Sequence, residues 1–574
     1  MTICDWNWTK LTNRSIAMLV MASMAGMAQA ADPALPHLEK RGAATQLMVD
    51  GKPFLVLGGE LHNTAASSAE YMAAVWPVLN AKMHLNTVLA GIGWNWIEPI
   101  EGKYDFSLVD AALAQARSNN LRMVWLWFGS WKNGLSSFAP GWVKADQQRF
   151  PRVAIRGGKS LEVLSPLSET NREADARGFA AFLRHLREVD QRHTVIMVQV
   201  ENEVGVIGDS RDRSAAANAA FAQPVPVALI DYLQKHKDDL LPEFRQVWQV
   251  AGFKTAGSWE EVFGQGAKAD EVFMGWNYSR YIDRVAEAGK KEYPLPMYVN
   301  AWIVQPDDKG PGDYPSGGPQ DHMHDIWRAG APNLDLLSPD IYLPNFADLA
   351  ARYSRSGNAL FVPESFAGTR GAANAFYAIG QQRAIGYSPF GFEAAPTGLG
   401  EPQSAPPPNP EKLPLSEAYD VLSQLSPMIL EHQAKGTIAG VQLDRQHPDQ
   451  QIRLGDYTLN VGLTRNVRTP NVVPDLAGYG LFMATGPGEY VLAGNNVQIT
   501  FTPATAGPPI AGIALQEAGR FEKGQWVVTR LLGGDDSVLR YDFATVAHMN
   551  QSGSGVRLST GERGIQLVHL YRYR

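Results

Sequence analysis

The chain has 574 residues, of which 45% are hydrophobic and 19% are charged, and its formal net charge is −7. This length exceeds one average domain, and the composition is that of a folded globular protein with a sizeable core. The acidic balance, without any run of Lys or Arg, argues against binding to nucleic acids or to anionic membranes, because nothing would neutralise phosphate groups.

The first 30 residues have the pattern of an export signal. Lys10 and Arg14 precede an apolar run at 16–27, and an A-x-A cleavage site follows at 28–30. The apolar run has about 12 residues, fewer than the roughly 20 that span a bilayer. We therefore expect cleavage of this segment and a secreted, periplasmic product without a membrane attachment; a single membrane anchor is the alternative.

Metal and thiol chemistry are not expected. Cys4 is the single cysteine and lies inside the export segment, so the mature protein would have no disulfide and no thiolate ligand. Asp321-His322-Met323-His324 holds the His pair that most resembles a metal site, but we interpret it as a loop or the start of a helix. The sequence predicts neither a metal nor a cofactor.

Between residues 44 and 436, short apolar runs alternate with amphipathic stretches, the pattern of βα units around a parallel sheet. Phe179, Phe182, Leu183 and Leu186 form one helical stripe. Eight units predict a (β/α)8 TIM barrel at 31–436, with its active site at the carboxyl ends of the strands. The expected strands are 54–59, 87–93, 122–128, 195–203, 297–303, 336–342, 360–366 and 384–392.

A second domain is expected at 437–574. Residues 394–414 are rich in Pro, Gly and Ser and are interpreted as a loop, since 415–430 has helical period and can form the last barrel helix. Beyond it, period-2 alternation at 457–461 and 497–501, between Gly- and Asn-rich turns, predicts an all-β sandwich or jelly roll. We expect a structural role for this domain; glycan binding is the alternative.

Two expected strands end in carboxylates, Glu203 on the fourth and Glu364 on the seventh. Hydrolysis of a glycosidic bond requires one acid that protonates the leaving oxygen and a second carboxylate that stabilises or attacks the sugar carbon. Strands 4 and 7 face each other across an eight-stranded barrel, so this pair can converge on one bond. Glu201 is a rival to Glu203, because alternation puts both on one face unless a bulge redirects them.

Gln199-Val200-Glu201-Asn202-Glu203 resembles the Q-[IV]-E-N-E signature of family 35 β-galactosidases, in clan A of the glycoside hydrolases. The segment 94–106, beginning Trp94-Asn95, is similar to the family's W-N-x-H-E-P block, and 58–62 to its first-strand segment. The resemblance implies that Glu203 is the acid/base and that Asn202 binds the substrate's 2-hydroxyl. Glu364 is expected to be the nucleophile from its place at the tip of the seventh strand, because its surroundings, Pro363-Glu364-Ser365-Phe366, differ from the family's usual motif. The chain departs from the family at three positions that would bear on galactose contacts: Asn63, Ile97 and Ser130.

Four further residues are candidates for substrate binding, each with a structural alternative. Tyr342 can hydrogen-bond the nucleophile, as in clan A relatives, or cap the barrel core. Asn95 and Glu98 can bind sugar hydroxyls, although Glu98 can equally hold its own loop. Trp302 can stack on a sugar face or belong to the core.

The sequence therefore predicts a retaining, exo-acting β-galactosidase that releases terminal galactose from oligo- or polysaccharides, such as the side chains of plant cell-wall xyloglucan. The partner is a carbohydrate substrate, and no oligomeric state is indicated. Another clan A β-glycosidase and an inactive carbohydrate-binding protein are the alternatives.

Overall fold

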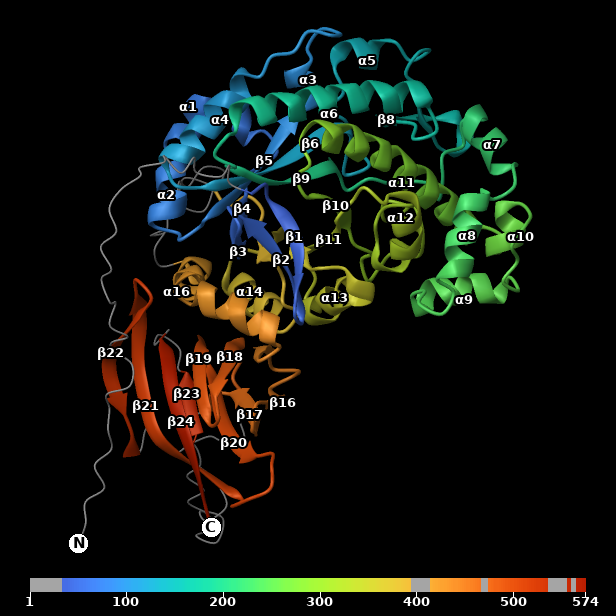
Figure 1. Ribbon diagram of the computed structural model, residues 1–574. Coiled ribbons are helices and arrows are strands. Elements are labelled where there is room, and N and C mark those ends of the chain that lie inside the picture. Colours follow the sequence, from blue (N-terminus) through green and yellow to red (C-terminus); the bar gives the residue numbers. More distant parts are fainter. Residues whose placement is uncertain (1–33, 394–412, 466–472, 535–554, 559–563) are drawn as a thin grey trace, which may run out of the picture.

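The computed structural model describes residues 34–393, 413–465, 473–534, 555–558 and 564–574. The expected export segment, and the expected loop at 394–414 up to residue 412, lie outside these ranges. The described chain forms a barrel of strands and helices and, below it in Figure 1, an all-β unit.

The barrel is one parallel sheet in the order β12-β14-β4-β5-β6-β9-β10-β11-β13. This confirms the expected (β/α)8 arrangement, and every strand lies within or close to an expected run. Its strands are β4 (Val56–Glu60), β5 (Thr87–Gly93), β6 (Arg122–Lys132), β9 (Val195–Asn202), β10 (Met297–Trp302), β11 (Leu336–Ile341), β12 (Phe361–Val362), β13 (Glu364–Ser365) and β14 (Gly386–Tyr387).

The seventh expected strand is divided in two at Pro363. Its first half, β12, pairs with β14, and its second half, β13, pairs with β11. Proline has no N–H and a fixed φ, so the hydrogen-bond ladder cannot run through it. The two halves stand at the two ends of the strand order and are consecutive in the chain, which closes the sheet into a barrel.

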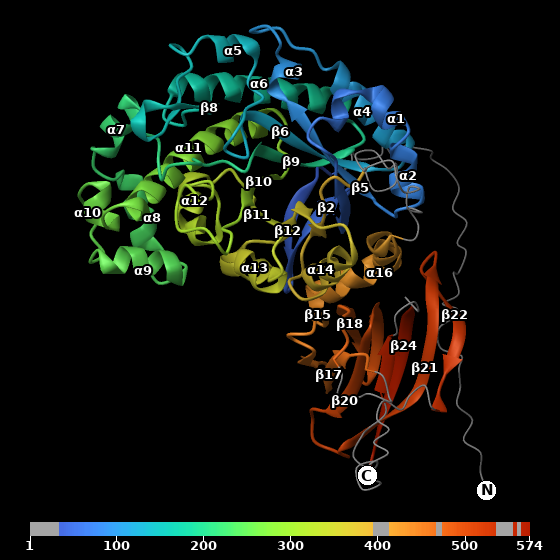
Figure 2. The same cartoon turned by 180° about the vertical axis from the view of Figure 1, so that it is seen from behind.

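Helices surround the sheet, as Figures 1 and 2 show from opposite sides. The expected stripe of Phe179, Phe182, Leu183 and Leu186 is fully buried on α6 (Glu169–Val189). The helices that follow the strands are α1 (Ala69–Ala73), α2 (Trp76–Ala81), α3 (Trp94–Ile97), α4 (Ser107–Ser118), α5 (Gly141–Ala145), α6 (Glu169–Val189), α7 (Ala215–Phe221), α8 (Val227–Lys235), α9 (Pro242–Val250), α10 (Trp259–Phe263), α11 (Ala267–Glu292), α12 (His324–Gly330), α13 (Phe346–Tyr353), α14 (Thr369–Gly380) and α16 (Pro414–Lys435).

Four short 3-10 helices and two small sheets complete this part of the chain. The 3-10 helices are η1 (Ala65–Ser67), η2 (Arg156–Gly158), η3 (Asp321–Met323) and η4 (Arg355–Gly357). β7 (Arg152–Ala154) pairs with β8 (Ser160–Leu164), and β1 (His37–Arg41), β2 (Ala44–Val49) and β3 (Lys52–Phe54) form an antiparallel sheet that the sequence analysis did not predict. Leu47 and Val49 of β2 pack with Leu89, Leu126 and Phe361 from the barrel interior.

The C-terminal unit is a sandwich of two antiparallel sheets, as expected. α16 ends at Lys435 and the first strand begins at Ile438, so the expected boundary at residue 436 lies between them. One sheet contains β15 (Ile438–Leu443), β18 (Gly478–Gly486), β19 (Glu489–Asn495), β24 (Ile565–Tyr573), β21 (Ile510–Glu522) and β22 (Gln525–Leu532); the other contains β16 (Asp449–Leu454), β17 (Tyr457–Leu463), β20 (Val497–Pro503) and β23 (Gly555–Leu558).

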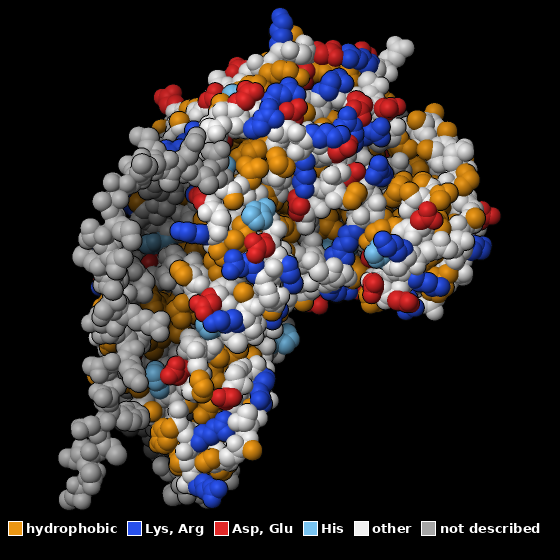
Figure 3. Space-filling view, viewed as in Figure 1, with side chains coloured by type: hydrophobic (Ala, Val, Ile, Leu, Met, Phe, Trp, Pro, Cys, Tyr) orange, Lys and Arg blue, Asp and Glu red, His pale blue; other side chains and the backbone are white. Residues whose placement is uncertain are grey.

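On the face shown in Figure 3, basic and acidic side chains are interspersed over the barrel rather than gathered into one patch. Ion pairs such as Arg184–Glu292 and Arg284–Glu173 tie the neighbouring helices α6 and α11 together. Among the described residues, no helix combines the length and the apolar character that crossing a bilayer requires.

Candidate active site

The tip of β9 is irregular, and this irregularity separates the two rival glutamates. The register between β6 and β9 shifts after Trp127, and Glu201 and Glu203 both have positive φ, 63° and 44°. Positive φ is strained for a residue with a side chain and is maintained only when the surroundings enforce it. The backbone therefore leaves regular alternation, which is the condition under which the two side chains can diverge.

Glu201 is used by the scaffold. Its carboxylate accepts hydrogen bonds from the backbone N–H groups of Gly129, Ser130 and Trp131, at 2.9–3.2 Å. It lies close to Asp175 on α6, and burial, together with the charge of Asp175, raises its pKa well above the ordinary value. These contacts fasten the extended end of β6 to β9.

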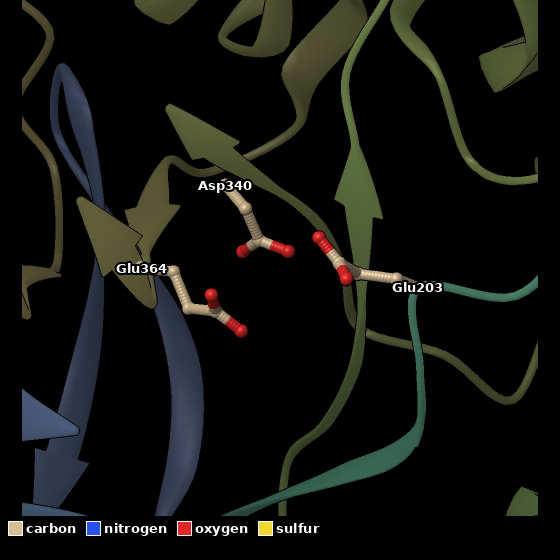
Figure 4. Close-up of side chains that lie close together, drawn as sticks. All are labelled: Glu203, Asp340 and Glu364. Atoms are coloured by element: carbon tan, nitrogen blue, oxygen red, sulfur yellow. The ribbon is translucent and has the colours of Figure 1, made fainter. Parts of the chain in front are cut away.

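Glu203 instead lies with Glu364 and Asp340, and Figure 4 shows the three carboxyl groups pointing toward one another. An oxygen atom of each lies within 4.8 Å of the others. Asp340 and Glu364 are register partners on the neighbouring strands β11 and β13, so both side chains leave the sheet on the same side. The structure thus brings together the carboxylate pair that the sequence analysis selected.

A chain of amides holds this group in place. Gln199 and Asn300 both donate to Oδ1 of Asn202, at 3.1 and 3.2 Å. Asn300 also donates to Asp340, at 2.8 Å, and its Oδ1 accepts from the backbone N–H of Glu203. Nδ2 of Asn202 is left facing Glu203, at 3.5 Å. Asn202 therefore presents N–H groups, and no acceptor, toward the carboxylates.

Glu364 is buried and has two neighbours that favour its charged form. The Tyr342 hydroxyl donates to Oε2 at 3.0 Å, which is the first of the two roles that the sequence left open for this tyrosine. Burial raises the pKa of Glu364, while the Lys132 ammonium and the Tyr342 hydroxyl oppose that rise.

The surroundings of Glu203 favour its neutral, protonated form. Burial and the negative charge of Glu364 raise its pKa to about 7. Burial and the charges of Glu364 and Glu203 raise the pKa of Asp340 well above its ordinary range. Of the candidate catalytic pair, Glu203 therefore holds a proton near neutrality and Glu364 is helped to stay ionised.

Three residues of the site were not among the predicted ones: Glu60, Asp340 and Lys132. Glu60 and Lys132 lie at the tips of β4 and β6, both of which run further than the expected ends at 59 and 128. Asp340 shares a strand face with Tyr342, two residues on, so alternation from the predicted Tyr342 was the signal that could have found it.

The remaining candidates lie at the barrel rim with different contacts. Trp302 is half-buried and is the register partner of Asp340. Asn95 follows β5, and its buried Oδ1 has no hydrogen-bond partner among the described residues. Both carboxylate oxygens of Glu98 are occupied, by Trp94 Nε1 and the Gly102 N–H, at 2.8 and 2.7 Å. These contacts fit its alternative role of holding its own loop.

Carboxylate oxygens are suitable ligands for hard cations, and Glu203, Asp340 and Glu364 are close enough to share one. An acidic cluster of this kind is also common without an ion. The His pair at 322 and 324 is placed as expected, in η3 and at the start of α12. His322 pairs with Glu271 at 3.0 Å, so it belongs to a structural network.

Comparison with known proteins gives this geometry a context. Residues 78–264 match the model of glycoside hydrolase family 42, described as β-galactosidase, and residues 415–543 match one described as a domain of unknown function, DUF5597. A β-galactosidase of Xanthomonas manihotis is 28% identical over 218 residues, which make up 36% of this chain and 33% of that protein.

The barrel is β-galactosidase-like. Its similarity is to glycoside hydrolases of the clan A type, and the family model that matches is that of family 42, whereas the motif at 199–203 resembles family 35. The matched residues include β5, β6 and β9 and the candidate acid/base Glu203.

Solved structures of similar proteins cover part of the chain. Crystal structures of β-galactosidases from Rahnella sp. R3 and Bacillus circulans sp. alkalophilus each align with a TM-score of 0.44, at 16% and 15% identity. Each alignment covers 66% of this chain and 57% of the other. The chain thus spans a third of the Xanthomonas protein and little more than half of these two. The description of the barrel therefore rests on the strand order of this chain and not on these partial alignments.

Proposed function

We propose that this protein is a retaining β-galactosidase that acts by double displacement. One observation carries the proposal: oxygens of Glu203 and Glu364 lie within 4.8 Å of each other at the mouth of a β-galactosidase-like barrel. Retaining glycosidases place their two carboxyl groups about 5–5.5 Å apart, whereas inverting enzymes need about 6.5–9.5 Å to fit a water molecule.

In the first half of the reaction, Glu364 attacks the anomeric carbon of the galactoside. Glu203 gives its proton to the glycosidic oxygen, the bond to the leaving group breaks, and a galactosyl ester of Glu364 forms. A pKa of about 7 keeps Glu203 protonated up to neutral pH. Tyr342 and Lys132 help Glu364 to remain an anionic nucleophile.

In the second half, the ester removes the charge of Glu364, so the pKa of Glu203 falls and Glu203 can act as a base. It takes a proton from a water molecule whose oxygen attacks the anomeric carbon. Galactose leaves with its original configuration, Glu364 is released as a carboxylate, and Glu203 is protonated again. No step requires a group from outside the chain other than water.

The substrate in this proposal is a terminal β-linked galactose on an oligo- or polysaccharide, with the side chains of plant cell-wall xyloglucan as one source. The motif at 199–203 supports family 35-like recognition, in which Asn202 binds the 2-hydroxyl. Its Nδ2, which lies 3.5 Å from Oε2 of Glu203, is a donor beside the acid/base and is suited to that role. Asn95 and Trp302, at the tips of β5 and β10, would contact the rest of the sugar.

We also propose that the enzyme works outside the cytoplasm, because residues 1–30 have the pattern of a cleaved export signal. Fractionation of a bacterial host that expresses the full chain tests this proposal. The mature protein is expected in the periplasm, with an N-terminus near residue 31. A full-length protein that stays in the membrane fraction would contradict it.

The activity is tested with nitrophenyl β-galactoside against other nitrophenyl β-glycosides, comparing the wild type with Glu203→Ala, Glu364→Ala and, as a control on the exposed face of α6, Glu188→Ala. We expect preference for the galactoside, loss of turnover in both site variants and a normal control. Azide should restore activity to Glu203→Ala only, as a β-galactosyl azide. Proton NMR of the first product should show the β anomer.

Other outcomes would point to the alternatives. Preference for another glycoside would make the protein a different clan A hydrolase. An α anomer as the first product would rule out double displacement. Binding of galactosides without turnover would make it a carbohydrate-binding protein.

A further inference from the structure

Glu60 is a buried carboxyl group that the mechanism above does not use. It ends β4, has no exposed surface, and lies within hydrogen-bonding reach of Glu364. Within the part of the chain that the structure describes, no donor reaches either of its carboxyl oxygens. A buried carboxylate without any donor is strongly disfavoured, so this group has to hold a proton or a cation.

Glu364, the neighbour of Glu60, also lacks a hydrogen-bond donor at one of its carboxyl oxygens within the described ranges. Oε2 of Glu364 accepts from Tyr342, but the buried Oε1 has no donor among the described residues. Two carboxyl groups in contact attract each other only if one of them carries a proton. A proton on Glu60 would supply the donor that Oε1 lacks and satisfy both groups at once.

The charges around Glu60 favour that placement of the proton. Burial, followed by the charge of Glu364, raises the pKa of Glu60 well above its ordinary value. The Lys132 ammonium lowers this pKa, whereas the charges of Glu203 and Glu393 raise it further. The titratable groups that face Glu60 from the surrounding strands and loops are Glu364 of β13, Lys132 of β6, Glu203 after β9, Tyr298 of β10, Asp340 of β11, Tyr342 after β11 and Glu393 after β14.

We propose that Glu60 is a positioning residue that stays a neutral acid and donates a hydrogen bond to Oε1 of Glu364, opposite the bond from Tyr342 to Oε2. The inference rests on the proposed function, because it gives Glu60 a role in the second half of that reaction. When the galactosyl ester is cleaved, Glu364 leaves as a carboxylate, and the Glu60 proton stabilises the charge that develops on Oε1. Glu60 keeps its proton throughout and forms no bond to the sugar.

The kinetic test uses an aryl galactoside with a good leaving group, so that cleavage of the ester limits the rate. Removal of the donor in Glu60→Ala is expected to lower kcat by about tenfold or more, the usual effect of one hydrogen bond to a charged group. KM should fall with it, because the ester accumulates, and a burst of aryl alcohol should precede the steady state. Glu60→Gln keeps an N–H donor and should recover much of the loss.

A purely structural role would give a different result in both variants: fewer active molecules, a burst reduced only in proportion to the active fraction, an unchanged rate per active molecule and an unchanged KM. Wild-type kinetics in Glu60→Ala would also overturn the proposal. So would a divalent cation whose removal by EDTA lowers the melting temperature of the wild type but not that of Glu60→Gln, since the carboxyls would then share a metal rather than a proton.

A second measurement does not depend on activity. A carboxyl whose pKa is raised in the folded state stabilises the fold less and less as the pH rises above about 4.5, its ordinary value. The melting temperature of Glu60→Gln should therefore exceed that of the wild type by a margin that grows toward neutral pH. A constant or shrinking margin would show that Glu60 is ionised and overturn the proposal. If no glycoside is hydrolysed, the proposed function fails, but this profile still reports the proton on Glu60.

Discussion

Glu364 interacts with Tyr342 through a hydrogen bond and with Lys132 through charge. Single substitutions can separate the effects of these two interactions. Tyr342 donates a hydrogen bond of 3.0 Å to one oxygen of Glu364, whereas Lys132 acts through its charge on Glu60, Glu203 and Glu364 together. The hydrogen bond therefore concerns the nucleophile alone, and the ammonium concerns the whole carboxyl cluster.

Tyr342→Phe removes only the hydroxyl. A hydrogen bond to a charged group is worth about 1.5–3 kcal/mol, so kcat/KM should fall by about 10–100-fold. The pKa of Glu364 should rise, because a donor that stabilises its charged form is lost, and the acidic limb of the pH profile should move to higher pH. The alkaline limb, from Glu203, should stay near pH 7. Tyr232→Phe on the distant α8 is the control, and an unmoved acidic limb would contradict the assignment.

Lys132→Met should behave differently. Lys132 lowers the pKa of both Glu203 and Glu364, so its loss should move the acidic and the alkaline limbs together to higher pH. On the acidic side of the optimum, kcat/KM should fall by about tenfold, equivalent to about 1.4 kcal/mol. Lys132→Arg should restore most of the profile, and Lys144→Met, on α5, should leave it unchanged. A shift of one limb alone would mean that Lys132 acts on a single carboxyl.

At the scale of elements, the strand tips decide which side chains reach the site. Alternation along a strand could not choose between Glu201 and Glu203, because the choice depends on the bulge between β6 and β9. That bulge is created by long-range contacts, in which three N–H groups of β6 bind Glu201. A sequence pattern contains no record of such contacts, so the resemblance to known motifs carried the choice.

The features of the fold that follow from local sequence pattern could be predicted, whereas those set by long-range contacts could not. Apolar runs placed every barrel strand, and helical period placed α6 and α16. The division of the seventh strand follows from Pro363, so its signal is contained in the sequence itself. The small sheet of β1–β3 and the extension of β6 to Lys132 were missed, since both are set by packing against the finished barrel rather than by local pattern.

Glu201→Ala tests the scaffold role of this residue. Three buried N–H groups would lose their acceptor, at about 1–3 kcal/mol for each unsatisfied group, so the melting temperature should fall by several degrees. Activity should also fall, because the backbone conformation that orients Glu203 is no longer held by the contacts of Glu201. Azide should not restore turnover, whereas it should restore Glu203→Ala. Rescue of Glu201→Ala by azide would make Glu201 the acid/base and overturn the assignment of Glu203.

At the scale of the whole molecule, the barrel and the β sandwich share one core. Figures 1 and 2 both show α14 and α16 lying between the barrel sheet and the strands below. Side chains of the six-stranded sheet belong to the same apolar cluster as the outer layer of the barrel; among them are Ile438, Tyr479, Leu481, Met483, Val491, Ala493 and Ile565. An apolar interface of this kind couples two units, because separating them would expose both faces to water.

Two glycines, Gly440 of β15 and Gly380 of α14, approach each other closely in that interface and provide a test of the coupling. A Cβ on Gly440 of β15 would lie 2.7 Å from the carbonyl oxygen of Phe376 and 3.1 Å from Cα of Gly380, both in α14. These are backbone atoms that cannot move aside, so Gly440→Ala should cost about 1–3 kcal/mol. If the two units unfold together, calorimetry should show one transition, lowered as a whole, and activity should disappear at the same temperature. Gly141→Ala, where a Cβ has open space, is the control. Two separate transitions, with the active barrel outlasting the β sandwich, would show that the shared core does not couple them.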